Sequence, residues 1–283
     1  MLMLWLASAI WGFAFVAQRE GMKYIGPFTF NGIRFAIGSL SLIPLLWLLP
    51  KDETKAVIPG FSRLKGGLLA GVILFAGASL QQAGMIWTTA GKAGFITGLY
   101  VILVPFIGIF IGQVIGRNVW IGALLAVAGL FLLTINDHFT IDKGDFLVLL
   151  SAFFWAIHVQ LINKLVTTLE PLRLAIIQFA VCAILSLFTA GLFETIQMNT
   201  IIQAIIPLLY GGLASVGIAY TLQVFAQRHV HPAIASIVLS FETVFAAIGG
   251  WLILNESLSI RSLAGCLMML AGIWIVKVKR KSL

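Results

Sequence analysis

The chain repeats itself across its midpoint, and this repeat restricts the possible folds more than any other feature of the sequence. The segment LASAIWGFAFVA (6–17) matches LLSAFFWAIHVQ (149–160), and the closing segment GALLAVAGLFLL (122–133) matches GCLMMLAGIWIV (265–276). Each copy contains an odd number of long apolar runs, so in a membrane the second copy has to insert upside down. Inverted halves that meet at the middle of the bilayer are the usual architecture of alternating-access transporters. The repeat therefore predicts both a fold and a class of function.

Composition places these apolar runs in a bilayer. Of the 283 residues, 60% are hydrophobic and only 10% are charged, and the mean hydropathy is +1.06, whereas a soluble domain has about 25% charged residues. The runs are long and do not alternate with polar residues, so we expect helices, whose backbone groups pair within each segment, and no β-barrel.

With about 20 apolar residues for each span, the sequence predicts an all-α integral membrane protein. We expect ten transmembrane helices in two inverted five-helix repeats, residues 1–135 and 144–277. The predicted spans are 1–17, 28–49, 66–88, 93–114, 118–135, 145–163, 172–192, 205–226, 232–253 and 261–277.

The positions of lysine and arginine predict how the spans are oriented. Cytoplasmic loops are enriched in these residues, and a cytoplasmic N-terminus places most of them inside, including those of segments 51–66 and 277–281. The opposite side then holds only Arg19, Lys23, Lys92, Lys143 and Arg261. We therefore expect a multi-pass protein of the cell (inner) membrane with both termini in the cytoplasm. The net charge of +8 then faces anionic membrane lipid, and no nucleic-acid partner is needed to explain it.

Four segments, taken with their order and duplication, resemble the drug/metabolite transporter superfamily, specifically its EamA-type members with ten helices. They are SAIWGFAF (8–15), GPFTFNGIRF (26–35), TTAGKAGFITGLYVILVP (88–105) and SIVLSFETVFAAIGGWLILNESLS (236–259). The resemblance covers essentially the whole chain. It implies a secondary carrier, often an exporter of amino acids or other small metabolites.

Glu242 is the only acidic residue well inside an apolar run. Intramembrane acids are costly and are often functional, and burial favours the neutral carboxyl, so Glu242 is a candidate proton-coupling residue. The alternative is a neutral carboxyl that bonds a neighbouring backbone group and fixes the helix geometry. The next residue, Thr243, stands where the family pattern usually has proline. Its counterpart in the fourth span is Pro105, which should kink that helix, so the halves are expected to differ there.

Two basic residues inside spans each allow two interpretations. His158 lies near the middle of the sixth span, one helical turn from Trp155. A histidine there is either a substrate or proton site or a packed, hydrogen-bonded residue. Arg34 lies about two turns into the second span. It either holds a substrate carboxylate in a bidentate contact or has a structural role, extending to the outer interface. The sequence leaves all of these open.

Other polar and aromatic side chains follow helical spacing and are candidates for a central substrate cavity. Small-molecule sites combine aromatic walls with a few polar groups, and residues three, four or seven apart share a helix face. Each candidate could instead bond a neighbouring helix. The predicted cavity residues are Trp11, Phe15, Arg34, Gln82, Thr97, Tyr100, Trp155, His158, Gln178, Tyr220, Gln223 and Ser240.

The sequence shows no pattern of catalytic residues. No nucleophile has an evident base in its sequence context, and His229 and His231 share a short loop without carboxylate or cysteine neighbours. We therefore expect no enzyme, no cofactor and no metal. The leading hypothesis is a carrier that exports small organic solutes, with a small-molecule substrate and membrane lipid as partners. The alternative is a non-transporting membrane scaffold or lipid-handling protein. Both a monomer and a homodimer remain open, as do the substrate and the coupling ion.

Overall fold

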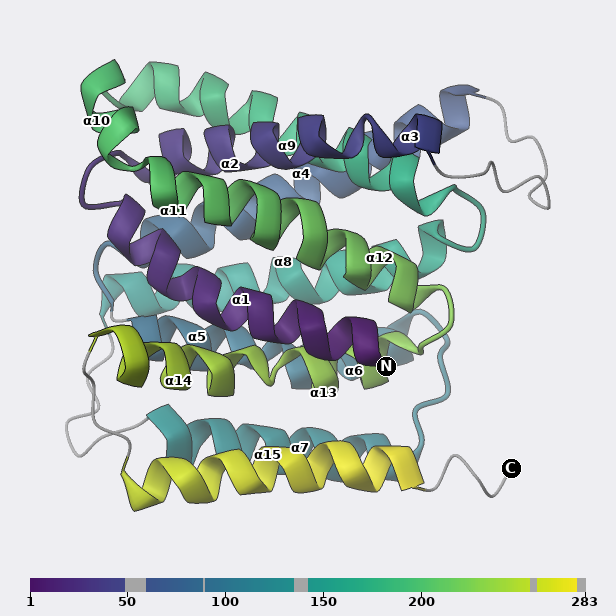
Figure 1. The fold of residues 1–283 in the computed structure, drawn as a ribbon. Helices are drawn as coiled ribbons and strands as arrows, with labels where there is room; N and C mark the ends of the chain where they lie inside the picture. The colour runs from purple at the N-terminus through teal and green to yellow at the C-terminus, as the bar shows by residue number, and fades with distance from the viewer. Residues whose placement is uncertain (49–59, 89, 135–141, 255–258, 279–283) are drawn as a thin grey trace.

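The chain forms a bundle of helices that run along one common direction (Figure 1). The computed structural model describes residues 1–48, 60–88, 90–134, 142–254 and 259–278, and every regular element within these ranges is a helix. The prediction of an all-α membrane protein is therefore confirmed. Parts of the two basic segments that oriented the chain, 51–59 and 279–281, lie outside the described residues.

The helices fall into two sets, one before and one after residues 135–141. The first set is α1 (Leu2–Gly21), α2 (Pro27–Leu42), α3 (Leu45–Leu48), α4 (Gly60–Gly84), α5 (Ala90–Gly98), α6 (Tyr100–Phe110) and α7 (Arg117–Thr134). The second set is α8 (Lys143–Leu165), α9 (Pro171–Phe193), α10 (Met198–Gln203), α11 (Ile205–Leu209), η1 (Tyr210–Tyr220), α12 (Thr221–Gln227), α13 (Pro232–Leu239), α14 (Glu242–Leu254) and α15 (Ile260–Val278).

Eight segments among the described residues are long and apolar enough to cross a membrane. They correspond to the first four predicted spans and to spans six to nine. The fifth and tenth predicted spans appear as the shorter apolar helices Arg117–Leu132 and Ile260–Val276. The order of apolar helices thus follows the sequence prediction, although two of the ten are shorter than a full span.

The fourth and ninth predicted spans are both interrupted near their middle. α5 passes into α6 at Leu99, and α13 passes into α14 at Ser240 and Phe241. At the second interruption the Thr243 amide donates to the Ser240 carbonyl at 3.2 Å, which is the hydrogen bond of a 3₁₀-type turn. Pro105 lies inside α6, so the interruption does not occur at the proline. Both halves therefore contain a broken helix, which in transporters is a common feature of binding sites.

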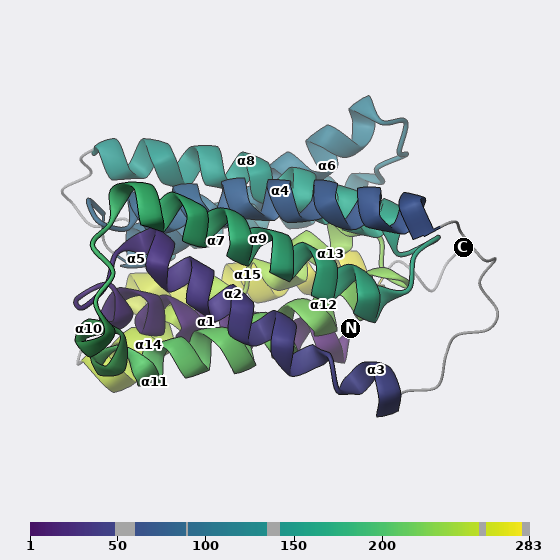
Figure 2. The same ribbon diagram turned by 90° about the horizontal axis from the view of Figure 1, so that it is seen from above.

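Helices of the two halves pack on one another. α7 packs along α15 and α2 along α9, and α4 lies between α8 and α9 (Figures 1 and 2). The pattern of contacts is preserved when α1, α2 and α4 are exchanged for α8, α9 and η1, their counterparts in the other half. The contact of α4 with α8 then corresponds to that of η1 with α1, and the contact of α4 with α9 corresponds to that of η1 with α2. α1 begins and α15 ends at the same end of the bundle (Figure 1).

Glycines allow these paired helices to approach closely. A Cβ added to Gly129 of α7 would lie 2.5 Å from the carbonyl oxygen of Gly265 in α15. A Cβ added to Gly71 of α4 would lie 2.5 Å from Cβ of Val181 in α9. Association in lipid depends on such close packing, because lipid tails are as apolar as the helix surfaces. These small residues therefore stabilise contacts between the two halves.

Two buried apolar clusters lie on either side of the bundle centre. The larger involves α6, α7, α13 and α15 and includes Leu130 and Met269. The second involves α2 and α9 and includes Phe35 and Phe179. Trp11 and Trp155 pack against both clusters. These two indoles therefore mark the place where the clusters meet.

Candidate functional site

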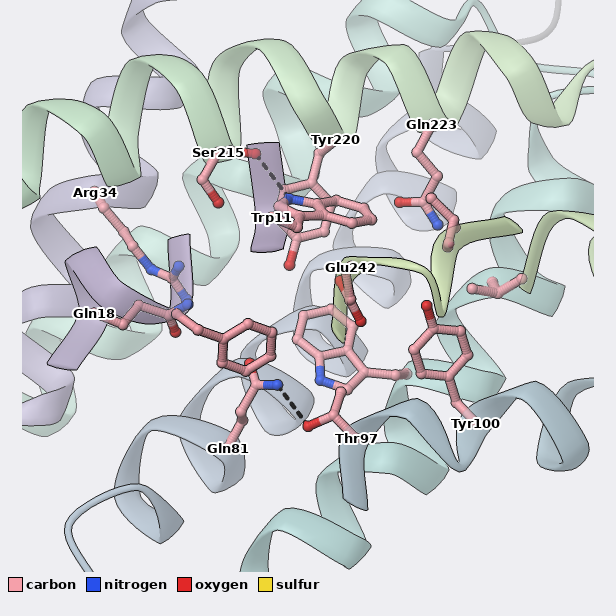
Figure 3. A pocket seen from close by; sticks show the side chains of 14 residues that line it. Trp11, Gln18, Arg34, Gln81, Thr97, Tyr100, Ser215, Tyr220, Gln223 and Glu242 are labelled. Atoms are coloured by element: carbon pink, nitrogen blue, oxygen red, sulfur yellow. Dashed lines mark hydrogen bonds between the residues drawn. The ribbon is translucent and has the colours of Figure 1, made fainter. Parts of the chain in front are cut away.

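A cavity lies where the two clusters meet, near the middle of the spans, and both halves of the chain line it (Figure 3). Its free space is about 50 Å³, which is room for several waters because one water-sized sphere needs about 10–15 Å³. The walls combine aromatic rings, amides and two ionisable groups. The lining residues are Trp11, Phe15, Gln18, Arg34, Gln81, Thr97, Tyr100, Trp155, Val159, Ser215, Tyr220, Gln223, Leu239 and Glu242.

Three aromatic side chains form one wall of the cavity. Trp11 meets Tyr220 edge to face with ring centroids 4.6 Å apart, and Trp155 stacks on Tyr220 at 6.0 Å. The indole nitrogen of Trp11 donates to the carbonyl oxygen of Ser215 at 3.1 Å (Figure 3). Offset and edge-to-face pairs of this kind add about 0.5–1.5 kcal/mol beyond the burial of their surface. The wall is therefore fixed by contacts between α1, α8 and η1.

The segment that carries Ser215 and Tyr220 is a π-helix over its whole length, Tyr210–Tyr220. π-Helices are rare and occur frequently at functional sites. Gly212 lies against Ile37 of α2, where an added Cβ would lie 2.6 Å from the Ile37 Cβ atom. The Tyr210 hydroxyl donates to the carbonyl oxygen of Ile10 at 2.9 Å. The π-helix is thus held between α1 and α2, with Tyr220 facing the cavity.

Arg34 of α2 lies at one end of the cavity, near Gln18 (Figure 3). Its side chain is only 2% exposed. The Nε atom donates to Oδ1 of Asn31 at 2.9 Å, and the guanidinium lies over the rings of Phe30 and Phe35 at 5.7 and 4.9 Å. Among the residues that the structure describes, no carboxylate lies within ion-pair distance of this guanidinium. The cation is therefore stabilised by an amide and by aromatic faces.

Glu242 is the first residue of α14, directly after the interruption of the ninth span, and its side chain points into the cavity (Figure 3). Tyr100 lines the same cavity. α1 approaches its backbone closely, because a Cβ on Gly12 would lie 2.6 Å from the Glu242 carbonyl oxygen. The glutamate is 6% exposed. The break in the helix therefore brings one buried acid to the end of the cavity that also holds Tyr100.

Comparison with known proteins identifies the family. The sequence pattern of the EamA-like transporter family matches residues 1–135 and 142–278, which is nearly the whole chain. The chain belongs to the EamA-like transporter family. The resemblance that the sequence motifs indicated is thereby confirmed, and the chain is a multi-pass membrane protein of a transporter family.

Relatives of this EamA-like chain occur in several organisms. An uncharacterized transporter of Archaeoglobus fulgidus is 31% identical over 97% of this chain and 84% of its own length. The uncharacterized transporter YoaV of Bacillus subtilis is 25% identical over 95% and 93%. A solved crystal structure is 16% identical and superimposes with a TM-score of 0.80 over 100% of this chain and 98% of its own. This last similarity concerns the fold alone.

Nine of the residues predicted for the EamA-like site line the cavity. They come from six different spans, which the sequence alone does not bring together. The nine are Trp11, Phe15, Arg34, Thr97, Tyr100, Trp155, Tyr220, Gln223 and Glu242.

The structure places the other four predicted residues outside the cavity lining. His158 is fully buried behind Tyr220 and bonds Gln178, with 2.8 Å between Nε2 and Oε1. Ser240 donates to the carbonyl oxygen of Ile237 at 2.9 Å, within its own helix turn. Gln82 is buried, and neither atom of its amide has a protein partner. His158, Gln178 and Ser240 therefore form contacts between or within helices, whereas the Gln82 amide forms no hydrogen bond with the described protein groups.

Five lining residues were not predicted. Gln18 follows Trp11 by seven and Phe15 by three, so helical spacing could have found it. Gln81 donates to the Thr97 hydroxyl at 2.9 Å, but its neighbour Gln82 was predicted instead. Adjacent residues on a helix point about 100° apart, and only packing decides which one faces inward. The other three are Val159, Ser215 and Leu239, two of which are apolar and give no signal in the sequence.

The two halves are also joined by polar contacts at the end of the bundle away from the start of α1 (Figure 1). Glu194, at the end of α9, accepts from the amides of Phe28 and Thr29 at 2.8 Å each and from the Thr29 hydroxyl at 2.6 Å. Lys92 of α5 pairs with Asp145 of α8 at 3.0 Å. These contacts lie beyond the cavity, between helices that belong to different halves.

His231, in the short loop before α13, has a structural role. The Nδ1 atom of His231 accepts from the amide of Ala233 at 3.3 Å and so caps α13. Within the described ranges, no three His, Cys, Asp or Glu side chains come close enough together to hold a metal ion.

Proposed function

We propose that this EamA-like protein is a secondary transporter that exports small organic solutes, amino acids or related metabolites, by alternating access through the central cavity. The observation that carries the proposal is the composition of the cavity walls. Trp11 and Arg34 come from the first half, and Tyr220 and Glu242 from the second. Rocking one half against the other would therefore separate the walls of the site and open it to one side.

The proposed transporter consists of two inverted repeats, residues 1–135 and 144–277. The exchange symmetry of the helix contacts supports this arrangement. We place both termini in the cytoplasm and the protein in the cell (inner) membrane. Arg117, Lys164, Arg173 and Arg228 support this orientation, because they begin or end helices at the end of the bundle where α1 starts, and cytoplasmic ends are enriched in such residues.

Glu242 is the proposed site of proton coupling. It is a buried acid that lines the cavity together with Tyr100, so a change in its charge would directly affect a bound solute. In a low-dielectric site, one added charge alters the binding of neighbouring groups far more than it does in water. A proton on Glu242 and a solute in the cavity are therefore expected to exclude or to require one another.

The test is flux in proteoliposomes. Proteoliposomes that contain either the wild type or the Glu242→Gln variant would be loaded with a mixed pool of amino acids and metabolites. Flux would then be measured with and without a proton gradient. The expected result is gradient-driven movement of a subset of the pool by the wild type, and loss of the gradient dependence in Glu242→Gln. Glu20→Gln is the matched control, because Glu20 pairs with Lys23 at the bundle end and should retain coupled flux.

Each outcome decides between specific alternatives. Equal, gradient-driven flux in both proteins would keep the transporter and assign Glu242 to helix geometry. Absence of flux for every solute under every ion gradient would favour the scaffold or lipid-handling alternative. In that case, apolar replacements of Gln18 and Gln223 should also leave the protein's biological activity unchanged.

A further inference from the structure

Most hydrogen-bond donors of the Arg34 guanidinium are not used by the fold. A guanidinium has five N–H donors, and only the Nε donor has a partner in the described structure, the Asn31 side chain. Phe30 and Phe35 cover faces of the group but accept no in-plane hydrogen bond. The terminal nitrogens belong to a residue that lines the cavity. They are therefore available to something inside it.

The charge of Arg34 also lacks a counter-ion. Burying an unpaired cation is strongly unfavourable, and a charged group inside a span usually faces a partner or a functional cavity. The Arg34 side chain does not extend to the outer interface, since it is 2% exposed and lies in the protein interior. Glu242, the acid that lines the same cavity, forms no ion pair with Arg34. The described protein groups therefore leave this charge without a counter-ion in the cavity.

We infer that Arg34 is the specificity-determining residue for a carboxylate, so that the solute carried by this protein is a small organic carboxylate. This inference rests on the proposed transport function. The two terminal nitrogens bind the two carboxylate oxygens in a bidentate contact. Asn31 accepts a hydrogen bond from Nε, and this bond fixes the plane of the guanidinium. The rest of the solute lies against Trp11 and Tyr220.

The site favours a singly charged, planar anion. Arg34 is the only lysine or arginine among the lining residues that the structure describes, so a phosphate dianion would keep one uncompensated charge in a buried place. The free space of about 50 Å³ is small, and the aromatic wall suits an apolar or flat body next to the acid group. A chloride ion would satisfy the charge but would use neither the fork geometry nor the wall.

The experiment measures binding and not transport. Purified full-length protein in nanodiscs would be titrated with matched pairs of compounds, following the fluorescence of the tryptophans, two of which line the cavity. The pairs are propanoate and propanamide, hexanoate and hexanamide, and 3-phenylpropanoate and 3-phenylpropanamide. At least one carboxylate should bind about 10- to 100-fold more tightly than its amide, as expected for hydrogen bonds to a charged group. The preference should persist when gluconate replaces chloride in the buffer.

Three variants make the result decisive. Arg34→Gln should reduce the carboxylate preference to less than about threefold, while Arg34→Lys should keep part of it, since it retains the charge without the fork. Asn31→Asp leaves Arg34 in place but supplies a permanent carboxylate beside Nε, so it should also remove the preference. Arg173→Gln, which breaks an ion pair with Glu170 at the bundle end, should bind like the wild type.

Several results would overturn the inference. They are a preference that survives in Arg34→Gln and Asn31→Asp, amides that bind as well as carboxylates, no binding by any carboxylate of the panel, or a guanidinium occupied by chloride alone. Because binding is measured without flux, the two proposals fail separately. A carboxylate preference without flux would count against transport only, whereas flux of uncharged solutes without this preference would count against the role of Arg34 only.

Discussion

Trp11 of α1 donates a 3.1 Å hydrogen bond to the carbonyl oxygen of Ser215 in the π-helix η1, and this bond joins the two halves of the chain at the cavity wall. The same indole packs edge to face on Tyr220, one turn further along η1. Ser215 and Tyr220 both lie in the π-helical segment, so the hydrogen bond and the ring contact hold the same segment against α1. The bond therefore couples the shape of the cavity to the form of η1.

Replacing Trp11 by phenylalanine keeps an aromatic ring but removes the indole donor. We expect a loss of about 0.5–1.5 kcal/mol in the free energy of unfolding, the usual net value of one such bond, together with reduced solute flux. Thermal unfolding in detergent and proteoliposome flux measure the two effects. Trp274→Phe is the control, because Trp274 is exposed on the outside of the bundle and should change neither quantity. A Trp11→Phe variant as stable and active as wild type would show that the bond is unimportant.

Gly12 is needed where α1 crosses the start of α14. An added methyl group would collide with Cβ of Phe245 and lie 2.6 Å from the carbonyl oxygen of Glu242. Gly12→Ala should therefore destabilise the protein by about 1–3 kcal/mol, as overpacking does, and should displace Glu242. Thermal unfolding and the proton dependence of flux are the measurements.

The matched control for this substitution is Gly191→Ala in α9. An alanine Cβ at that position has no atom within 4 Å, so the change should be neutral or stabilise the helix by about 0.5–1 kcal/mol. Similar stability for the two alanine variants would contradict the close contact between α1 and α14.

Glu194 joins the end of α9 to the start of α2. Its two oxygens accept three hydrogen bonds, two of them from free amides of the first helical turn, where a negative charge is also favourable. Glu194→Gln removes the charge and one acceptor, and we expect a loss of about 1–2 kcal/mol in the free energy of unfolding. Glu20→Gln, which affects only an exposed pair with Lys23, should cost less than about 0.5 kcal/mol. Equal losses would indicate that the Glu194 contact is not a specific cap.

His158 and Gln178 form a buried pair, and each keeps one polar atom without a protein partner. Replacing either alone by leucine leaves the other side chain unpaired and should cost about 1–3 kcal/mol. The double variant removes both polar groups and should cost less than the sum, with a coupling energy of about 0.5–3 kcal/mol in a double-mutant cycle. Additive losses would argue against the pair. If His158→Leu loses proton-driven flux and Gln178→Leu retains it, His158 would again be a candidate for proton coupling.

The sequence by itself determined the helical membrane fold and identified most of the residues that line the cavity. Apolar runs of span length allow only helices in lipid, and Trp11, Phe15 and Gln18 share a helix face whatever the fold. Glu242 and Arg34 were identifiable because ionisable residues inside a span are costly and face the interior. These conclusions need only the length of a run, the period of a helix and the cost of a buried charge.

Tertiary structure decided how these helix faces meet. Gln81 faces the cavity and Gln82 does not, although the two are neighbours, because the rotation of α4 is set by its contacts with α8 and α9. The broken span that presents Glu242 lacks a proline at its interruption, and the π-register that offers the Ser215 carbonyl to Trp11 has no signature in local sequence. Both are stabilised by contacts between residues far apart in the chain. Such contacts arise only when the two halves pack together, and for this reason periodicity within one helix does not reveal them.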